Sequence, residues 1–358
     1  MKRNHLYSIF LAILAALLFG ASAPLAKLLL GNIEPLLLAA LLYLGSGLGL
    51  LGIKGLQRLG GTTTDREAGI TRPDIKWLTG ATLAGGVAAP IILMFGLRST
   101  PAATASLLLN FEGVATTIIA AMVFREGVSR HTWGAIAAIT LASILLSLNP
   151  GSEWGFSLGA VGILGACVLW GMDNNLTRNI SAKDPISIVT IKGLAAGSFS
   201  LLLAILVGNH LPGWTTMLLA LLLGAFSYGL SITLFIRAMR GLGAARTSAL
   251  YGTAPLAGLI LSFLLFSEPV SLLFWVAVPL MAVGTIFLVD EVHDHHHIHV
   301  SVEHEHAHTH DDGHHDHEHD NGLISSTSHS HIHDHLRLEH AHHHMPDINH
   351  RHTHVSGE

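Results

Sequence analysis

The stretch "RSTPAATASLLLNFEGVATTIIAAMVFRE" at residues 98–126 aligns without a gap on "RGLGAARTSALYGTAPLAGLILSFLLFSE" at residues 240–268, an offset of 142 residues. The matched pairs include Arg98 with Arg240, Ser106 with Ser248, Phe124 with Phe266, Glu126 with Glu268 and Trp133 with Trp275. Further upstream, "LLFGASAPLAK" (17–27) pairs with "VLWGMDNNLTR" (168–178), and Pro35 pairs with Pro185. Self-similarity of this kind indicates that one structural unit occurs twice in the chain.

Both copies are strongly apolar, whereas the C-terminal tail is not. Residues 1–289 carry 17 Lys and Arg against 10 Asp and Glu, and residues 290–358 carry 2 against 14. The single cysteine, Cys167, excludes a disulfide framework or a thiolate metal cluster. The tail is too polar to bury a core, so we predict that residues 290–358 are disordered.

The apolar part divides into segments long enough to cross a bilayer, which takes about 20 residues of helix. The ten segments are 7–29, 35–53, 77–97, 101–124, 132–148, 156–177, 185–207, 214–236, 243–266 and 270–289. Five fall in each copy, and an odd number of spans makes the two copies cross the membrane in opposite senses. The predicted fold is therefore an all-α polytopic membrane protein of ten transmembrane helices in two inverted five-helix repeats, with 1–148 as the first repeat, 149–289 as the second and 290–358 as the tail.

Basic residues predict the orientation of the spans. With the N-terminus inside, most Lys and Arg fall in cytoplasmic loops, while Lys27 and Arg98 fall outside. This distribution follows the positive-inside rule. It predicts a multi-pass membrane protein with both termini in the cytoplasm.

Four stretches carry a family resemblance: "LLFGASAPLAKLLL", "TASLLLNFEGVATTIIAAMVFREGVS", "LWGMDNNLTRNIS" and "TSALYGTAPLAGLILSFLLFSEPVS". They resemble the two EamA domains of the drug/metabolite transporter superfamily, over about residues 7–289. The resemblance implies a ten-helix secondary transporter of the plasma (inner) membrane, commonly an exporter of small metabolites. Many members have an arginine in the second span and a proline in the fourth, where this chain has Leu42 and Gly113; the second-half counterparts are Lys192 and Pro255.

Three ionisable residues lie inside predicted spans: Glu112, Asp173 and Lys192. Such residues are costly in a membrane and are therefore candidates for function. Glu112 suits a proton carrier or a cation ligand, the alternative being a protonated carboxyl bonded to a neighbouring helix. Asp173 and Lys192 are predicted to meet as an ion pair, which serves either structure or substrate and gating. Asn110, Asn174 and Asn175 are the neutral candidates for transport or coupling.

The tail holds 24 of the 27 histidines, repeatedly as His-x-His. A flexible chain can wrap several imidazoles around Zn, Ni, Co or Cu, so we predict that the tail binds a divalent metal. The candidate ligands are His295, His297, His304, His306, His308, His310, His315, His317, His319, His331, His333, His342, His344, His352 and His354. The alternative is a merely solubilising tail.

The functional prediction is a secondary-active transporter, an exporter of a small metabolite with a metal-binding cytoplasmic tail. The alternative is an exporter of a divalent transition metal or metal–ligand complex loaded from the tail. A membrane-tethered metal store is a third class, against which the inverted repeat argues. No nucleotide-binding loop, nucleophile elbow or zinc-protease motif occurs, so neither an enzyme nor a nucleic-acid partner is expected. The expected partners are the lipid bilayer and the substrate, with a homodimer left open, and no cofactor is required.

Overall fold

The computed structural model describes residues 2–59, 68–123, 130–148, 157–180, 183–242, 250–267 and 269–289, together with the backbone of 293–299, 302–308, 329–335 and 338–344 in the tail. The helices of the first half are α1 (Lys2–Gly20), α2 (Ser22–Leu29), α3 (Pro35–Leu59), η1 (Arg72–Asp74), α4 (Ile75–Ala81), η2 (Thr82–Ala88), α5 (Ala89–Ser99), α6 (Ala102–Leu108), α7 (Phe111–Val123) and α8 (Arg130–Ser147). Those of the second half are α9 (Leu158–Arg178), α10 (Pro185–Leu206), α11 (Trp214–Leu223), η3 (Gly224–Leu230), α12 (Ser231–Leu242), α14 (Ala254–Leu265) and α15 (Leu272–Val289).

Each of the ten predicted apolar segments contains helix in the described part of the chain. Six helical stretches are long and apolar enough to cross a membrane, and they are Leu6–Leu29, Pro35–Leu56, Arg72–Ser99, Ala102–Val123, Pro185–Leu206 and Trp214–Phe235. Thr132–Ser147, Ala254–Leu265 and Leu272–Phe287 are shorter apolar helices. The remaining predicted segment, 156–177, contains α9, a helix of 21 residues whose apolar sequence is interrupted by the polar run 173–175. The architecture is that of a polytopic membrane protein.

Local chemistry sets where two of these helices begin. Pro35 and Pro185 occupy the first helical position, where a missing N–H is not needed. Before α10, the Asp184 side chain accepts a hydrogen bond of 3.0 Å from the Ile186 amide and so caps the helix. The same side chain forms an ion pair of 2.8 Å with Lys54 at the end of α3.

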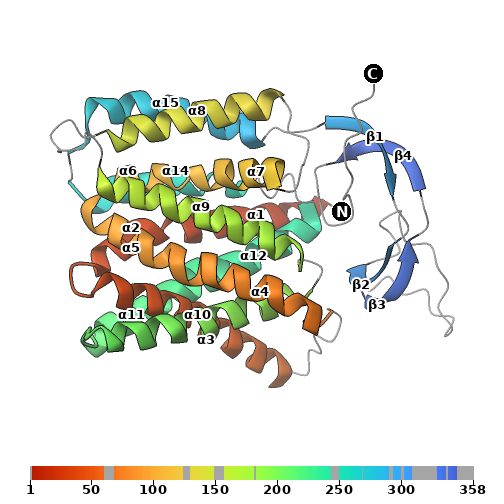
Figure 1. Ribbon diagram of the computed structural model, residues 1–358, viewed down its shortest axis with the longest axis horizontal. Coiled ribbons are helices and arrows are strands. Elements are labelled where there is room, and N and C mark those ends of the chain that lie inside the picture. The colour runs from red at the N-terminus through yellow and green to blue at the C-terminus, as the bar shows by residue number, and fades with distance from the viewer. Residues whose placement is uncertain are drawn as a thin grey trace.

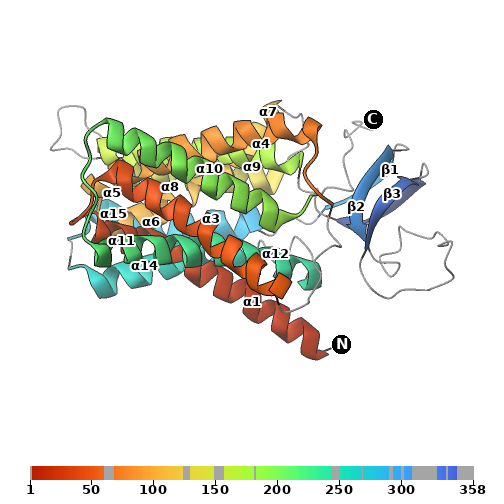
Figure 2. The ribbon, with the colours of Figure 1, turned by 90° about the horizontal axis from the view of Figure 1, so that it is seen from below.

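The helices lie side by side in one bundle, seen along two directions in Figures 1 and 2. Helix α3 packs against α10, α8 against α15, α1 against α12, and α5 against α9. Under the predicted repeat, α3 and α10 are counterparts, as are α8 and α15. In the same way α1 corresponds to α9 and α12 to α5, so the contact of α1 with α12 in one half matches that of α9 with α5 in the other.

Two irregular turns recur at the offset of the sequence repeat. The described residues contain π-helical turns at η2, Thr82–Ala88, and at η3, Gly224–Leu230, which are 142 residues apart. A π-turn shifts backbone pairing to i→i+5 and occurs frequently at functional sites. Each turn interrupts a helix of otherwise ordinary geometry, between α4 and α5 and between α11 and α12.

A second irregularity also occurs once in each half. Residues Leu109 and Asn110 form a turn between α6 and α7, and Gly252 and Thr253 form one immediately before α14. In both places the chain continues as helix beyond the turn. Discontinuous helices of this kind are a recurring element of transporter binding sites.

The tail contributes the only strands among the described residues: β1 (His293–His299), β2 (Val302–His308), β3 (His329–His335) and β4 (Leu338–His344). Strand β1 pairs antiparallel with β4, and β2 with β3. Their register places His295 opposite His342, His304 opposite His333 and His306 opposite His331. These four segments alternate histidine with other residues, a period of two that suits a strand.

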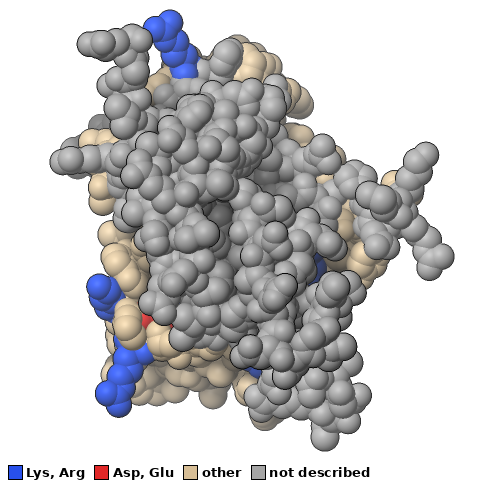
Figure 3. Space-filling view, turned by 90° about the vertical axis from the view of Figure 1, so that its right-hand side faces the viewer, with Lys and Arg blue, Asp and Glu red and all other residues tan. Residues whose placement is uncertain are grey.

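The tail lies at the end of the bundle where the N-terminus also emerges (Figure 1). Figure 3 views that end, and lysine and arginine side chains stand out at its edge among the described residues that it shows.

Candidate functional site

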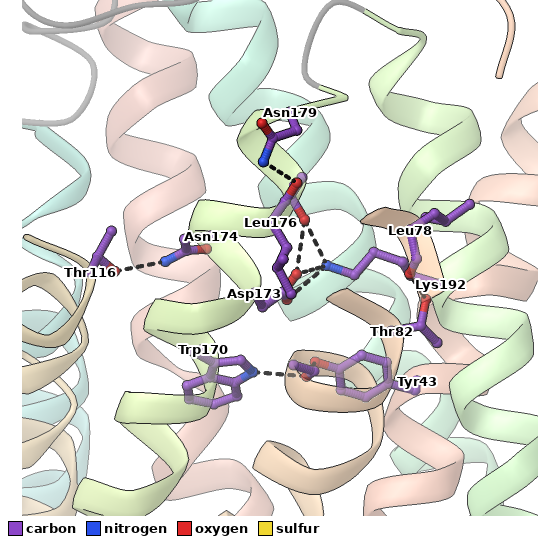
Figure 4. Close-up of polar contacts among 12 residues, drawn as sticks. Tyr43, Leu78, Thr82, Thr116, Trp170, Asp173, Asn174, Leu176, Asn179 and Lys192 are labelled. Carbon is purple, nitrogen blue, oxygen red and sulfur yellow. Dashed lines mark hydrogen bonds and ion pairs between the residues drawn. The ribbon is translucent and has the colours of Figure 1, made fainter. Parts of the chain in front are cut away.

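The predicted contact between Asp173 and Lys192 is present. The Lys192 Nζ donates to both carboxylate oxygens of Asp173, at 2.6 and 2.7 Å, and both side chains are largely buried. Thr177, one turn further along α9, donates to the Asp173 Oδ1 at 2.8 Å. Figure 4 shows the side chains of Asp173 from α9 and Lys192 from α10 pointing toward one another. The aspartate thus has two donors and no unsatisfied oxygen.

Although α9 and α10 follow one another in the sequence, η2 lies between them at this ion pair. The π-turn η2 packs against both α9 and α10. Gly85 in this turn lies under the Asp173 carboxylate, and a Cβ there would come within 1.9 Å of the Asp173 Oδ2. The pair therefore forms across the backbone of η2, which only a glycine leaves open.

The Gly85 carbonyl is a second junction of the same region. It accepts a hydrogen bond from the Tyr43 hydroxyl at 2.6 Å and another from the Trp170 Nε1 at 3.0 Å. Because a π-turn alters the pairing of its own carbonyls, this oxygen can accept from side chains of α3 and α9. Tyr43 and Trp170 point toward one another below the ion pair (Figure 4).

Glu112 lies at the second residue of α7, directly after the break in the fourth segment. Its Oε1 accepts a hydrogen bond of 2.9 Å from the Asn174 Nδ2, which also donates to the Thr116 Oγ1 at 3.2 Å. Thr116 donates in turn to the Glu112 backbone carbonyl at 2.8 Å. Asn175 donates to the carbonyls of Thr116 and Gly171, at 3.0 and 2.8 Å. These bonds join α7 to α9.

Asn110, the remaining candidate, lies in the turn itself. Its backbone nitrogen donates to the Leu107 carbonyl, and its carbonyl accepts from the Gly113 amide. Asn110 therefore lies at the break between α6 and α7, two residues before Glu112 in the chain. Hydrogen bonds join Asn174 and Asn175 of α9 to α7, and a separate set joins Asp173 of α9 to Lys192 of α10. Asn110 borders the first set.

The exposure of Asn174 indicates that this region is accessible from inside the bundle. The outer face of α9 is marked by Val168 and Met172, both exposed. At about 100° per residue, Asn174 lies about 200° around the helix from Met172. It falls between Cys167 and Trp170, which are buried, yet Asn174 is exposed and Glu112 is half-buried. The exposed amide and the half-buried carboxyl therefore lie on the inner side of α9.

Aromatic side chains occupy the neighbouring part of the interior. Ring centroids are 5.7 Å apart for Tyr43 and Tyr228, 6.1 Å for Tyr228 and Phe19, and 5.5 Å for Phe19 and Tyr251. Tyr251 continues to Phe235 at 4.7 Å. Tyr43 is also bonded to the Gly85 carbonyl, so the aromatic row adjoins the polar cluster at that end.

Sequence reasoning missed Tyr43, Trp170, Thr116, Thr177 and the Gly85 carbonyl. Only Tyr43 carried a usable signal, as a lone hydroxyl-bearing ring within the aliphatic run 35–53. The others depend on which helix faces which.

The metal prediction falls mostly outside what the structure describes. The side chains of all fifteen candidate histidines lie outside the described residues, and His310, His315, His317, His319, His352 and His354 lie wholly outside them. Within the described side chains, no group of three or more His, Cys, Asp or Glu could hold a metal ion.

Comparison with known proteins agrees with this architecture. The sequence profile of the EamA-like transporter family matches twice, over residues 6–148 and 157–290. A protein of Methanothermobacter thermautotrophicus described as an uncharacterized transporter is 29% identical over 303 residues, covering 80% of this chain and 87% of its own. A solved crystal structure superposes with a TM-score of 0.56 at 21% identity, over 78% of this chain and 95% of the other, which is a likeness of fold.

The two profile matches together take in almost the whole apolar part of the chain, and family and relative both point to a transporter rather than an enzyme. This multi-pass membrane protein belongs to the EamA-like transporter family.

Proposed function

We propose that the protein is a secondary-active exporter of a small metabolite, with ten spans arranged as two inverted halves. The π-turns at the repeat offset support this arrangement, because η2 and η3 occupy equivalent positions in the two halves. The paired breaks before α7 and α14 support it in the same way. In transporters built from inverted repeats, the substrate binds near the midplane at the interface of the repeats.

The observation that carries the proposal is the accessible carboxyl of Glu112 beside the exposed amide of Asn174. Both lie on the inner side of α9 and next to a helix break. A membrane protein stabilised only by packing has no reason to keep a carboxyl and an amide there, because each is costly in a bilayer. Glu112 and Asn174 are the proposed substrate or coupling contacts, and the Asp173–Lys192 pair borders them on the other side of α9.

We place the protein in the plasma membrane with both termini in the cytoplasm. The excess of Lys and Arg in the loops on the side of the N-terminus supports this orientation. The histidine-rich tail then lies in the cytoplasm, where it would bind Zn, Ni, Co or Cu and sense or buffer the metal.

Export of the metal itself is the competing function, with the tail as a loading site. The described membrane part favours a metabolite instead, since it offers no cluster of three or more metal-ligating side chains. A transition metal held by nitrogen and oxygen ligands requires about four of them.

The test compares cells that express the wild-type protein, Glu112→Gln, or the matched control Glu34→Gln, whose carboxyl is exposed at a helix end. Solutes released into the medium are quantified without preselection. We expect at least one metabolite to accumulate in the medium with the wild type and the control, and not with Glu112→Gln. Equal release by Glu112→Gln at equal membrane abundance would contradict the proposal.

A second arm addresses the metal alternative. Tolerance to Ni, Co, Zn and Cu is measured for the full-length protein and for a truncation after Asp290. Metal tolerance that is raised in both constructs and lost with Glu112→Gln would overturn metabolite export in favour of metal export. Metabolite export that persists after truncation, without a change in metal tolerance, supports the proposal.

A further inference from the structure

The end of the bundle that carries the N-terminus has more cations than its carboxylates can pair with. Successive spans run in opposite directions, so α4, α8 and α10 begin at this end, and α3, α9, α12 and α15 end there (Figure 1). Its described carboxylates, Asp74 and Asp184, are already paired with Lys183 and Lys54. By sequence, 14 of the 17 Lys and Arg of residues 1–289 fall at this end, against five Asp and Glu.

Four exposed cations at this end form no ion pair with any described residue, and we call them the basic face: Arg72, Lys76, Arg130 and Arg237. Arg72 and Lys76 lie one turn apart where η1 leads into α4, Arg130 begins α8, and Arg237 lies in the second half of α12. The Lys76 Nζ lies 4.9 Å from the centroid of the Trp77 ring. Figure 3 looks onto this end and shows lysine and arginine side chains standing out at its edge.

The first part of the tail has the opposite charge. Residues 290–320 contain ten Asp and Glu, 13 His and no Lys or Arg. The segment directly follows α15, which ends at Val289 at the same end of the bundle. A flexible chain of this length has an end-to-end distance of about 30 Å, or about three helix diameters. The tail segment can therefore reach the basic face, and its attachment holds it there at a high local concentration.

A divalent metal would cancel this attraction. Neutral imidazoles bind transition metal ions without adding negative charge, so each bound ion brings two positive charges to the segment. About five such ions would offset the carboxylates of residues 290–320. The segment is thus anionic without metal and close to neutral when loaded.

From this arrangement, and resting on the proposed function, we infer that metal-free residues 290–320 dock on the basic face and that a bound transition metal releases them. The docked segment covers the end at which an exported solute enters the bundle, so its release couples export to the metal level of the cytoplasm. Anionic lipid headgroups are the competing occupant of a basic face beside a membrane. The tail is favoured because it is attached to the same end of the bundle and carries charge of the opposite sign.

Docking is measured as a distance in the full-length protein, in nanodiscs of phosphatidylcholine. Spin labels are attached at Ser301→Cys in the segment and at Gly69→Cys, three residues before Arg72. A Cβ at Gly69 meets no atom within 4 Å, and the native Cys167 is buried and stays unlabelled. We expect short, narrowly distributed distances in EDTA. We expect a shift to longer and broader distances in 1 M NaCl, where the Debye length is about 3 Å.

The metal arm adds Zn²⁺ to the same labelled protein, with Mg²⁺ at equal concentration as the control. Zn²⁺ is expected to produce the same shift to long distances, whereas Mg²⁺, which prefers oxygen ligands and keeps its water, is expected to leave the short distances in place. Long distances in EDTA, or short distances that persist with Zn²⁺, would overturn the inference.

Variants and lipids then assign the surface. The triple variant Arg72→Gln, Lys76→Gln and Arg130→Gln is expected to lose the short distances in EDTA, whereas Arg98→Gln, at the other end of the bundle, keeps them. Short distances that survive in the triple variant would contradict docking on the basic face. The measurement is repeated in phosphatidylglycerol nanodiscs, where short distances are again expected. Docking in phosphatidylcholine alone would assign the face to lipid headgroups and overturn the inference.

The effect on export is measured in the cells of the transport assay. At low metal, truncation after Asp290 is expected to raise the initial rate of metabolite release above that of the full-length protein. Added Zn²⁺ is expected to raise the full-length protein to the rate of the truncated one, which itself does not respond. Equal rates for the two proteins at low metal would overturn the regulatory role of the segment.

The two proposals fail separately, because the distance measurement needs no transported solute. If the segment docks and Zn²⁺ releases it, but no solute is exported by cells, the transport proposal is wrong and the metal-dependent docking stands. If metabolites are exported through Glu112 but the segment does not dock, the inference is wrong and the transport function stands.

Discussion

Two halves of the bundle, each built from helices of both repeats, share a scaffold but differ in chemistry. Glu112 in α7 has Ala254 of α14 as its counterpart, and Asp173 in α9 has Ser22 of α2. Lys192 corresponds in the same way to an aliphatic residue of α3. The half of the bundle that joins α7 of the first repeat to α9 and α10 of the second, the polar half, therefore carries hydrogen-bonded polar groups. In the matching half, with α14, α2 and α3, the counterparts are Ala254, Ser22 and Leu42.

What the halves do share is close backbone approach. A Cβ at Gly171 would come within 2.8 Å of the Thr116 nitrogen, and one at Gly20 within 2.1 Å of the Ala254 carbonyl. Gly20 and Gly171 are matched in the repeat alignment, so α1 meets α14 as α9 meets α7. Close backbone approach therefore recurs at matched positions, whereas the polar site, with Glu112 from the first repeat and Asp173 and Lys192 from the second, occurs in one half of the bundle only.

The largest loss of stability is expected from breaking the ion pair of Asp173 with Lys192 in the polar half. Lys192→Met leaves the buried Asp173 carboxylate without its cation and is expected to cost about 3–5 kcal/mol of stability. The double variant Asp173→Asn with Lys192→Met recovers most of that loss, because neither charge is then buried alone. Thermal unfolding in detergent, followed by size-exclusion chromatography, measures both.

The repeat supplies the matched control for this prediction. Leu42, the counterpart of Lys192, is buried at 1% exposure. Leu42→Met conserves volume and is expected to cost less than about 1.5 kcal/mol. A Lys192→Met protein as stable as Leu42→Met would show that the ion pair adds nothing to the polar half.

The shared scaffold is tested by adding a methyl group at the two glycines. Both Gly20→Ala and Gly171→Ala are expected to destabilise the protein, by about 1–3 kcal/mol, because the backbone opposite has to move. The larger loss is expected at Gly20, where the closer atom is a carbonyl oxygen at 2.1 Å. Unfolding midpoints of the purified variants provide the comparison.

Gly165→Ala serves as the control on α9, since a Cβ there meets no atom within 4 Å. Replacing a helical glycine at such a position is expected to be neutral or to stabilise by about 0.5–1 kcal/mol. If Gly171→Ala behaves like Gly165→Ala, the contact between α7 and α9 is looser than that between α1 and α14.

Sequence alone predicted much of this architecture, because hydrophobic length and the 142-residue offset are local or pairwise properties of the chain. It also predicted the contact of Asp173 with Lys192, since both lie in consecutive spans near a short connection. It did not predict that η2 packs against both helices, with Gly85 under the carboxylate. Which element lies between two others depends on the packing of the whole bundle.

The aromatic row was beyond sequence reasoning for the same reason. Phe19, Tyr228 and Tyr251 come from three segments far apart in the chain, and an aromatic residue in a span is most simply read as packing. Their contacts with one another become evident only when α1, η3 and the residues before α14 are placed together. Glu112 itself was identifiable, because a lone acid in an apolar run is conspicuous in any sequence.

A smaller effect is expected at the Gly85 carbonyl. Tyr43→Phe removes one of its two side-chain donors and is expected to cost about 1–1.5 kcal/mol, as for a hydrogen bond in a largely buried setting. Tyr7→Phe, at an exposed ring of α1, is the control with no expected change. A loss in the double variant Tyr43→Phe with Trp170→Phe that exceeds the sum of the single losses would show that the carbonyl requires at least one donor, and strict additivity would contradict that view.

The smallest effect compares the acids that precede the two matched prolines. Asp184 pairs with Lys54 in a half-buried setting, whereas Glu34 pairs with Arg98 at the surface, with both side chains more than half exposed. Asp184→Asn is expected to cost about 0.5–1 kcal/mol and Glu34→Gln close to nothing, as for solvent-screened pairs. Unfolding midpoints at pH 7 measure both.

Lowering the pH distinguishes the loss of the Asp184 charge from other effects of the Asp184→Asn substitution. Burial by itself would raise the pKa of this carboxyl, but hydrogen bonds from Lys54, Ser187 and the Ile186 amide outweigh it and hold the pKa below its ordinary value. A carboxyl with a lowered pKa stabilises the folded state at pH values above its unfolded pKa of about 3.9, and this contribution disappears as the pH falls through the lower folded value. The difference between wild type and Asp184→Asn should therefore be constant from pH 8 to about pH 5 and shrink below about pH 4. A difference that persists undiminished at pH 3 would mean that the carboxylate charge is not what joins α3 to α10.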